Sequence, residues 1–147
     1  MLYSRYLAPL ALLAATLFAA TAVQANDRIC RGTISGQTID GNVKVPKGAS
    51  CVVTNSKIDG NIQAQGASSV IVRNSNVDGN IQLDKGGRAN IRSNRVNGDI
   101  QLFGNRGSLV VQGNTVDGNL QCKSNSRRPT GGRNQVDGNK EDQCARL

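Results

Sequence analysis

The chain contains no histidine and no tryptophan, and only four residues are aromatic. Three of the four precede residue 20, so Phe103 is the single aromatic residue after that point. Without histidine, the commonest general base and the commonest metal ligand are missing. A globular core of this length normally uses several aromatic side chains, so we expect a thin core of valine, isoleucine and leucine instead.

Residues 1–25 have the pattern of an export leader. Arg5 supplies a positive charge, an apolar run extends from Leu7 to Val23, and a small-x-small cleavage signal ends at Ala25. We expect cleavage after Ala25 and a periplasmic or secreted chain with no membrane span.

A tetrapeptide of the form Val/Ile-Asp-Gly-Asn is written six times after the leader, once with its polar residues exchanged. Its second residue recurs at intervals of 19, 19, 19, 20 and 20 positions, as Asp40, Asp59, Asp78, Asn97, Asp117 and Asp137. Apolar and polar residues alternate after each copy, as in Ile81, Gln82 and Leu83, and this is typical of a half-buried strand. A second alternating run precedes the next copy, and no stretch has a helical period.

These features predict an all-β parallel β-solenoid over residues 26–147, with about six coils of 19–20 residues. The V-D-G-N-I-Q-L frame resembles the right-handed parallel β-helix class, the architecture of pectate-lyase-like proteins and, more distantly, of bactofilins. This resemblance implies a single-stranded right-handed parallel β-helix. The closing run over residues 118–144 resembles the C-terminal end of uncharacterised exported bacterial β-helix proteins, a resemblance that implies no function.

The four cysteines form two pairs, each about one coil apart. Cys30 and Cys51 lie near the start, and Cys122 and Cys144 lie near the end. A bridge from Cys30 to Cys144 would have to span about five coils, roughly 24 Å, which a disulfide cannot reach. We therefore expect disulfides Cys30–Cys51 and Cys122–Cys144, each at one end of the solenoid. Ends closed in this way favour a monomer over a filament.

The recurring aspartates have two interpretations. In a turn, Asp or Asn bonds the backbone N–H two residues on and the glycine adopts a positive φ. Alternatively, stacked carboxylates bind calcium, with Asp59 and Asp78 as the candidates. In the fourth copy Asn and Asp exchange places, as Asn97 and Asp99. A turn tolerates this exchange more readily than a set of calcium ligands does, so the turn is favoured.

Two further columns are expected to be structural. The last tetrapeptide position predicts an amide ladder: Asn42, Asn61, Asn80, Asp99, Asn119 and Asn139. The column two residues before each tetrapeptide predicts an inner corner: Ser56, Ser75, Asn94, Asn114 and Asn134.

The formal net charge is +8, and basic residues form a candidate binding face. Its members are Arg73, Arg92, Arg95, Lys123, Arg127, Arg128 and Arg133. An anionic polysaccharide or lipopolysaccharide would suit such a face. Nucleic acid is disfavoured because no aromatic residues interleave with the charges. The alternative is an ordinary solvated surface.

The segment Lys123–Gln135 departs from the repeat pattern, and we expect it to replace a strand with a basic loop. The only glutamate is Glu141, and no repeat carries a long insertion that could form a catalytic cleft. We expect a non-catalytic protein without a cofactor. A small lyase-like enzyme acting on polysaccharide and a self-associating structural or adhesive element are the alternatives.

Overall fold

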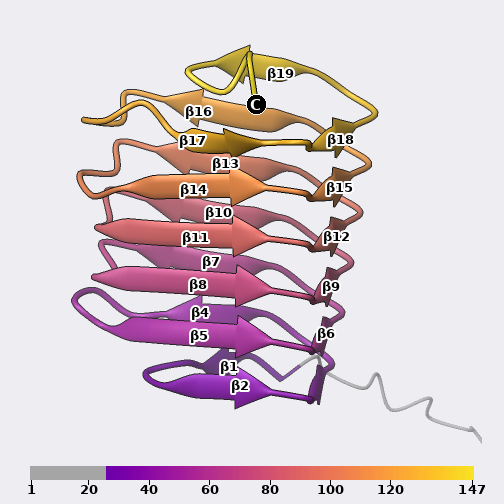
Figure 1. Cartoon of the computed structure of the whole chain (residues 1–147). Helices are drawn as coiled ribbons and strands as arrows, with labels where there is room; N and C mark the ends of the chain where they lie inside the picture. The colour runs from indigo at the N-terminus through magenta and orange to yellow at the C-terminus, as the bar shows by residue number, and fades with distance from the viewer. Residues whose placement is uncertain (1–25) are drawn as a thin grey trace, which may run out of the picture.

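The computed structural model describes residues 26–147, so the predicted leader lies outside the described residues. The described chain is all-β, with nineteen short strands arranged in three parallel sheets (Figure 1). Sheet A contains β1 (Arg28–Ile29), β4 (Val43–Val45), β7 (Ile62–Gln65), β10 (Ile81–Asp84), β13 (Ile100–Phe103), β16 (Leu120–Lys123) and β19 (Lys140–Asp142). Sheet B contains β2 (Thr33–Ser35), β5 (Ser50–Thr54), β8 (Ser69–Arg73), β11 (Arg88–Arg92), β14 (Leu109–Gln112) and β17 (Thr130–Gly132). Sheet C contains β3 (Thr38–Ile39), β6 (Lys57–Ile58), β9 (Asn76–Val77), β12 (Arg95–Val96), β15 (Thr115–Val116) and β18 (Gln135–Val136).

Each circuit of the chain contributes one strand to each sheet and stacks on the previous circuit. In Figure 1 the strands of sheet B cross the front toward the right, and those of sheet A return behind them toward the left. The chain climbs as it turns, which makes a right-handed solenoid, the sense that parallel crossover connections almost always take. The predicted parallel β-helix of about six coils is confirmed, with three strands per coil.

Identical repeat positions pair between neighbouring coils. In sheet A, Ile81 pairs with Ile62 on one side and with Ile100 on the other. Because successive side chains of a strand point to opposite faces, these residues form a buried ladder and the polar residues between them face solvent. The core is aliphatic, as predicted, while Phe103 lies outside it at the outward end of β13.

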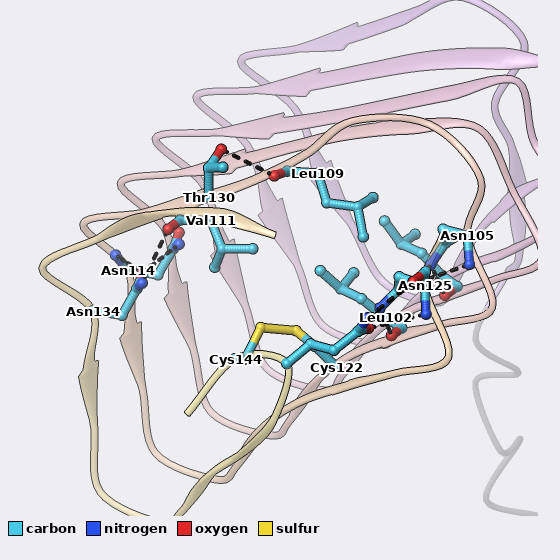
Figure 2. Close-up of a disulfide and its surroundings, with 12 residues drawn as sticks. Leu102, Asn105, Leu109, Val111, Asn114, Cys122, Asn125, Thr130, Asn134 and Cys144 are labelled. Atoms are coloured by element: carbon cyan, nitrogen blue, oxygen red, sulfur yellow. Dashed lines mark hydrogen bonds between the residues drawn. A yellow bond between two sulfur atoms is a disulfide. The ribbon is translucent and has the colours of Figure 1, made fainter. Parts of the chain in front are cut away.

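Both predicted disulfides are present. Cys30, directly after β1, is bonded to Cys51 in β5, with Cα atoms 5.6 Å apart. Cys122 in β16 is bonded to Cys144 beyond β19, with Cα atoms 5.3 Å apart (Figure 2). Leu147 packs against the core at the C-terminal end. Two disulfides are consistent with an oxidising environment.

Residues 26–147 contain no helix long and apolar enough to cross a membrane.

The tetrapeptide glycines do not adopt a positive φ, so that prediction is wrong. Most positive φ values occur at two other places, the corner between sheets A and B and the corner between sheets B and C, and the rest are at Gly131, Gly132 and Asp142. The tetrapeptide glycines are instead required by close stacking. A Cβ added at Gly60 would lie 2.7 Å from the carbonyl oxygen of Gly41 in the coil before it.

The segment Lys123–Gln135 contains a short strand, so the prediction that the strand is replaced is wrong, whereas residues 124–129 before it form a basic loop as predicted. Thr130–Gly132 is β17, which pairs in parallel with β14. Pro129 is buried, and it occupies the same column as Leu109 of the preceding coil, because Thr130 pairs with Val110. A Cβ at Gly131 would collide with the backbone of Val111. Gly131 therefore allows the close approach of β17, although the Thr-Gly-Gly sequence resembles a loop.

Candidate functional site

The three corners of the solenoid differ sharply in charge. The corner between sheets C and A is built from the tetrapeptides and carries only carboxylates: Asp40, Asp59, Asp78, Asp99, Asp117 and Asp137. The corner between sheets B and C carries one charged residue, Arg133. The corner between sheets A and B, called here the basic corner, comprises residues 30–32, 46–49, 66–68, 85–87, 104–108 and 124–129. It contains no acidic residue, and its cations are Arg31, Lys47, Lys85, Arg106, Arg127 and Arg128.

A hollow of about 550 Å³ opens at the basic corner. Its lining is formed by Lys47, Gln65, Gly66, Lys85 and Arg106, which come from four successive coils. Lys85 has one carboxylate nearby, with its Nζ 3.6 Å from Asp84 Oδ2. Within residues 26–147, neither Lys47 nor Arg106 has a carboxylate within 4 Å. The hollow therefore presents two cations, Lys47 and Arg106, whose charge is not balanced by a nearby carboxylate.

A second hollow, of about 510 Å³, adjoins the first on the outer face of sheet A. The two hollows share Lys47 and Gln65. The second is also lined by Lys44, Val45, Pro46, Gln63, Ala64, Gln82 and Asp84. One continuous depression thus extends from the basic corner onto sheet A.

The outer face of sheet A carries a ladder of glutamine side chains, called here the glutamine ladder: Gln63, Gln82, Gln101 and Gln121. Gln63 Nε2 donates to Gln82 Oε1 at 3.2 Å, and Gln82 Nε2 donates to Gln101 Oε1 at 3.0 Å. Gln101 continues the series to Gln121 at 2.9 Å, and Gln121 donates to the Glu141 carboxylate at 3.0 Å. All four amides therefore point the same way along the solenoid axis.

A buried amide ladder that the sequence reasoning missed supports the basic corner from inside (Figure 2). Asn125 Oδ1 accepts the backbone N–H of Asn105 at 2.9 Å, and Asn105 Nδ2 donates to the carbonyl of Leu83 at 3.0 Å. Asn125 bonds in the same way to Leu102 O and to Gln143 Oε1. The 20-residue interval between Asn105 and Asn125, equal to the local tetrapeptide spacing, is the signal that could have revealed this ladder.

The predicted inner corner, where sheets B and C meet, is confirmed. Ser56, Ser75, Asn94, Asn114 and Asn134 are all buried. Asn114 Oδ1 accepts the backbone N–H of Asn94 at 3.0 Å, and Asn114 Nδ2 donates to Ile91 O at 2.9 Å. In the earlier coils a serine hydroxyl accepts the equivalent backbone hydrogen bond, since Ser75 Oγ accepts the backbone N–H of Ser56.

The seven predicted basic residues do not lie on one face. Arg73 and Arg92 are paired neighbours on the outside of sheet B, and Arg95 lies on sheet C with its Nη2 3.1 Å from Asp117 Oδ2. Arg133 lies at the corner between sheets B and C, on the same side as Arg73 and Arg92.

Three of the seven reach the basic corner or its rim: Lys123, Arg127 and Arg128. The sequence reasoning missed Lys47 and Lys85 and gave Arg106 no special place. Lys47 and Lys85 stand in the same position relative to β4 and β10, directly before a glycine, and this repeated Lys-Gly pair was the available signal.

The predicted turn ladder is held by its asparagine column. Asn42 Oδ1 accepts the backbone N–H of Asn61 at 2.9 Å, and Asn61 Oδ1 accepts that of Asn80 at 2.8 Å. Each side chain therefore bonds the next coil, which confirms the amide ladder. Across residues 26–147 no tetrapeptide aspartate makes the expected bond to the backbone two residues on.

The aspartate column faces outward toward the cations of sheet C. Lys57 contacts the carboxylate of Asp59, and its Nζ lies 3.5 Å from Asp78 Oδ2. The hydrogen bond that Lys57 Nζ donates to the Asp59 carboxylate raises the pKa of the Lys57 ammonium. A calcium ion at Asp59 and Asp78 would have to displace Lys57. In the described part of the chain no three acidic or cysteine side chains are grouped to hold a metal.

Comparison of the chain with protein-family models, with curated proteins and with solved structures found no match.

Proposed function

We propose that this chain is an exported, non-catalytic β-solenoid that binds an acidic polysaccharide along its basic corner. The observation that carries the proposal is the hollow lined by Lys47, Lys85 and Arg106 at a corner with no carboxylate of its own. Arg127 and Arg128 extend the row of cations into the last full coil.

The geometry suits a linear polyanion. Neighbouring coils are separated by about 4.8 Å, so the row from Lys47 to Arg127 covers four coil steps, about 19 Å. Cations aligned on a low-dielectric wall focus the field and attract an extended anion more strongly than scattered charges do. The backbone and the buried amides hold the corner rigid, so little conformational entropy is lost on binding.

A polysaccharide suits this surface better than a nucleic acid. Phe103 is the only aromatic side chain on the described surface, so successive bases have no series of rings on which to stack. Amide groups beside the cations can instead bond hydroxyl groups. The paired cysteines and the predicted leader support a periplasmic or secreted site of action. The resemblance to exported bacterial β-helix proteins belongs to the same proposal.

The proposal is for binding without catalysis. Asp84 is the only carboxylate that lines either hollow, whereas general acid and base work on a glycosidic bond ordinarily uses two. A lyase-like activity would show itself by release of unsaturated sugars that absorb in the ultraviolet.

The test compares two triple variants that each remove three positive charges. One changes Lys47, Lys85 and Arg106 to Gln; the other changes Arg73, Arg92 and Arg133 to Gln on the opposite side. Both are applied to immobilised alginate at about 50 mM salt, where charges are weakly screened. The first variant should elute early and the second should elute with the unchanged protein.

Equal retention of both variants would contradict the proposal, as would failure of the unchanged protein to bind. A parallel arm with lipopolysaccharide, whose carbohydrate carries the same kind of anionic groups, distinguishes a free polymer from a membrane-anchored one.

A further inference from the structure

We infer that the glutamine ladder and Phe103 form a second half of the polysaccharide site, one that recognises sugar hydroxyls and ring faces rather than charge. This inference rests on the proposed function and adds a source of specificity to it. The basic corner alone would accept any polyanion, whereas the combined surface accepts one made of sugars.

The glutamine ladder has unused hydrogen-bonding capacity. A glutamine amide has two N–H donors and an oxygen with two acceptor sites. Along the ladder Gln82 and Gln101 each use one donor toward the next coil and one acceptor site toward the previous coil. Each therefore retains one donor and one acceptor site, and both amides are half-buried on the outer face of sheet A. A hydroxyl group, which both donates and accepts, matches that pair.

The side chains of the glutamine ladder are already ordered before any ligand binds. Its four hydrogen bonds fix the rotation of every amide, and the last bond ends on the Glu141 carboxylate. A free glutamine loses much of its rotamer freedom when it binds a ligand. Here the solenoid has already fixed these side chains, so hydroxyl contacts cost little additional entropy.

Phe103 lies beside the glutamine ladder, where its ring can contact a sugar. Its ring lies on the outer face of β13, two residues after Gln101, and is neither part of the core nor packed against it. In the same column it is paired with Asp84 of β10 and Lys123 of β16, and it is half-buried on this outer face. A sugar ring presents C–H groups on its faces, and packing against an aromatic ring removes apolar surface from water.

These elements lie side by side and in a fixed order across the surface. The glutamine ladder comes first, the column of Gln65, Asp84 and Phe103 comes next, and the basic corner follows along each coil. A chain of sugars lying parallel to the solenoid axis would place its rings over the first two columns. Its carboxylates would then face Lys47, Lys85 and Arg106.

The test separates recognition of sugar from recognition of charge by using two polymers. Polygalacturonate is an acidic chain with hydroxyls and sugar rings, and inorganic polyphosphate is an acidic chain with neither. The test variant combines Gln101→Met and Phe103→Ala. The control variant is Gln112→Met, at an outward position of β14 on sheet B. Affinities are measured by calorimetry at one fixed salt concentration.

The test variant should lose about tenfold in affinity for polygalacturonate, as expected for two hydrogen bonds and a ring contact, and keep its affinity for polyphosphate. The control should bind both polymers like the unchanged protein. Retained polyphosphate binding also shows that the test variant is folded.

Equal changes toward both polymers, or none toward either, would overturn the inference. The proposed function would then stand if the basic-corner triple variant still weakens binding of both polymers. The proposed function itself fails if the unchanged protein binds neither polymer.

Discussion

The side-chain amide of Asn97 donates a hydrogen bond to the carboxylate of Asp78, with Nδ2 3.2 Å from Oδ1. Asp78 also faces Lys57 on its other side, at 3.5 Å. Two residues later, Asp99 Oδ1 accepts the backbone N–H of Asn119 at 2.7 Å. The exchanged tetrapeptide is therefore compatible with both columns, because its second residue acts as a donor here and its fourth residue needs only to accept.

Changing Asn97 to Asp should destabilise the protein by about 0.5 kcal/mol at low salt. The substitution replaces a donor with a second carboxylate beside Asp78, and like charges on neighbouring strands repel. Urea denaturation at low and high salt measures the change. The difference from the unchanged protein should shrink as salt rises, and a difference that is the same in both conditions would contradict the electrostatic explanation.

Changing Gly60 to Ala should destabilise the solenoid by about 1–3 kcal/mol, because the added methyl group cannot fit between stacked turns. Its Cβ would lie 2.7 Å from the backbone of Gly41 and from Asn42 Oδ1. Gly32 is the matched control, since a Cβ there meets no atom within 4 Å. Thermal melting of both variants tests the prediction. A Gly60→Ala protein as stable as Gly32→Ala would show that the turns are not closely stacked.

Changing Asn114 to Ala should cost about 3 kcal/mol, since the buried N–H of Asn94 and the carbonyl of Ile91 both lose their partner. Changing Asn114 to Ser should cost less, because serine already fills this column at Ser75, where its Oγ accepts a backbone N–H. Chemical denaturation of the two variants provides the comparison. Equal losses would mean that the ladder stabilises by packing and not by hydrogen bonding.

The first coil should weaken at acidic pH through Asp27. Hydrogen bonds from Lys44 and then Asn42 hold the pKa of this carboxyl below its ordinary value of 3.8. A depressed pKa in the folded state means that the stabilisation is present above the ordinary value. It is lost as pH falls through the lower, folded-state pKa.

Changing Lys44 to Met should move the pKa of Asp27 back up toward its ordinary value, whereas Lys140→Met, at the other end of the solenoid, should not. Titration of the Asp27 carboxyl carbon by NMR follows both. An unchanged titration curve in Lys44→Met would rule out the lysine as the cause.

The repeat interval predicted much of the structure because a solenoid translates sequence period directly into spatial contact. Positions 19 or 20 residues apart become neighbours, so the buried column through Ile81 and the inner corner through Asn114 could both be predicted from the sequence. The disulfide pairs were predictable for the same reason. The predictions were wrong where one residue type has two physical roles. At Gly60, glycine is required because a side chain would not fit between stacked coils, and not because the backbone needs a positive φ.

The sequence alone determined the coil, its parallel strands and its aliphatic interior, because those depend on period and alternation. Only the tertiary structure decided which charges share a surface. Lys47 and Lys85 are separated by 38 residues and Arg106 follows 21 residues later, and the three line one hollow because sheets A and B meet at a corner there. Arg73 and Arg92, equally prominent in sequence, face a different side. The outward direction of a residue depends on the sheet or corner that holds it, and a linear pattern does not contain that information.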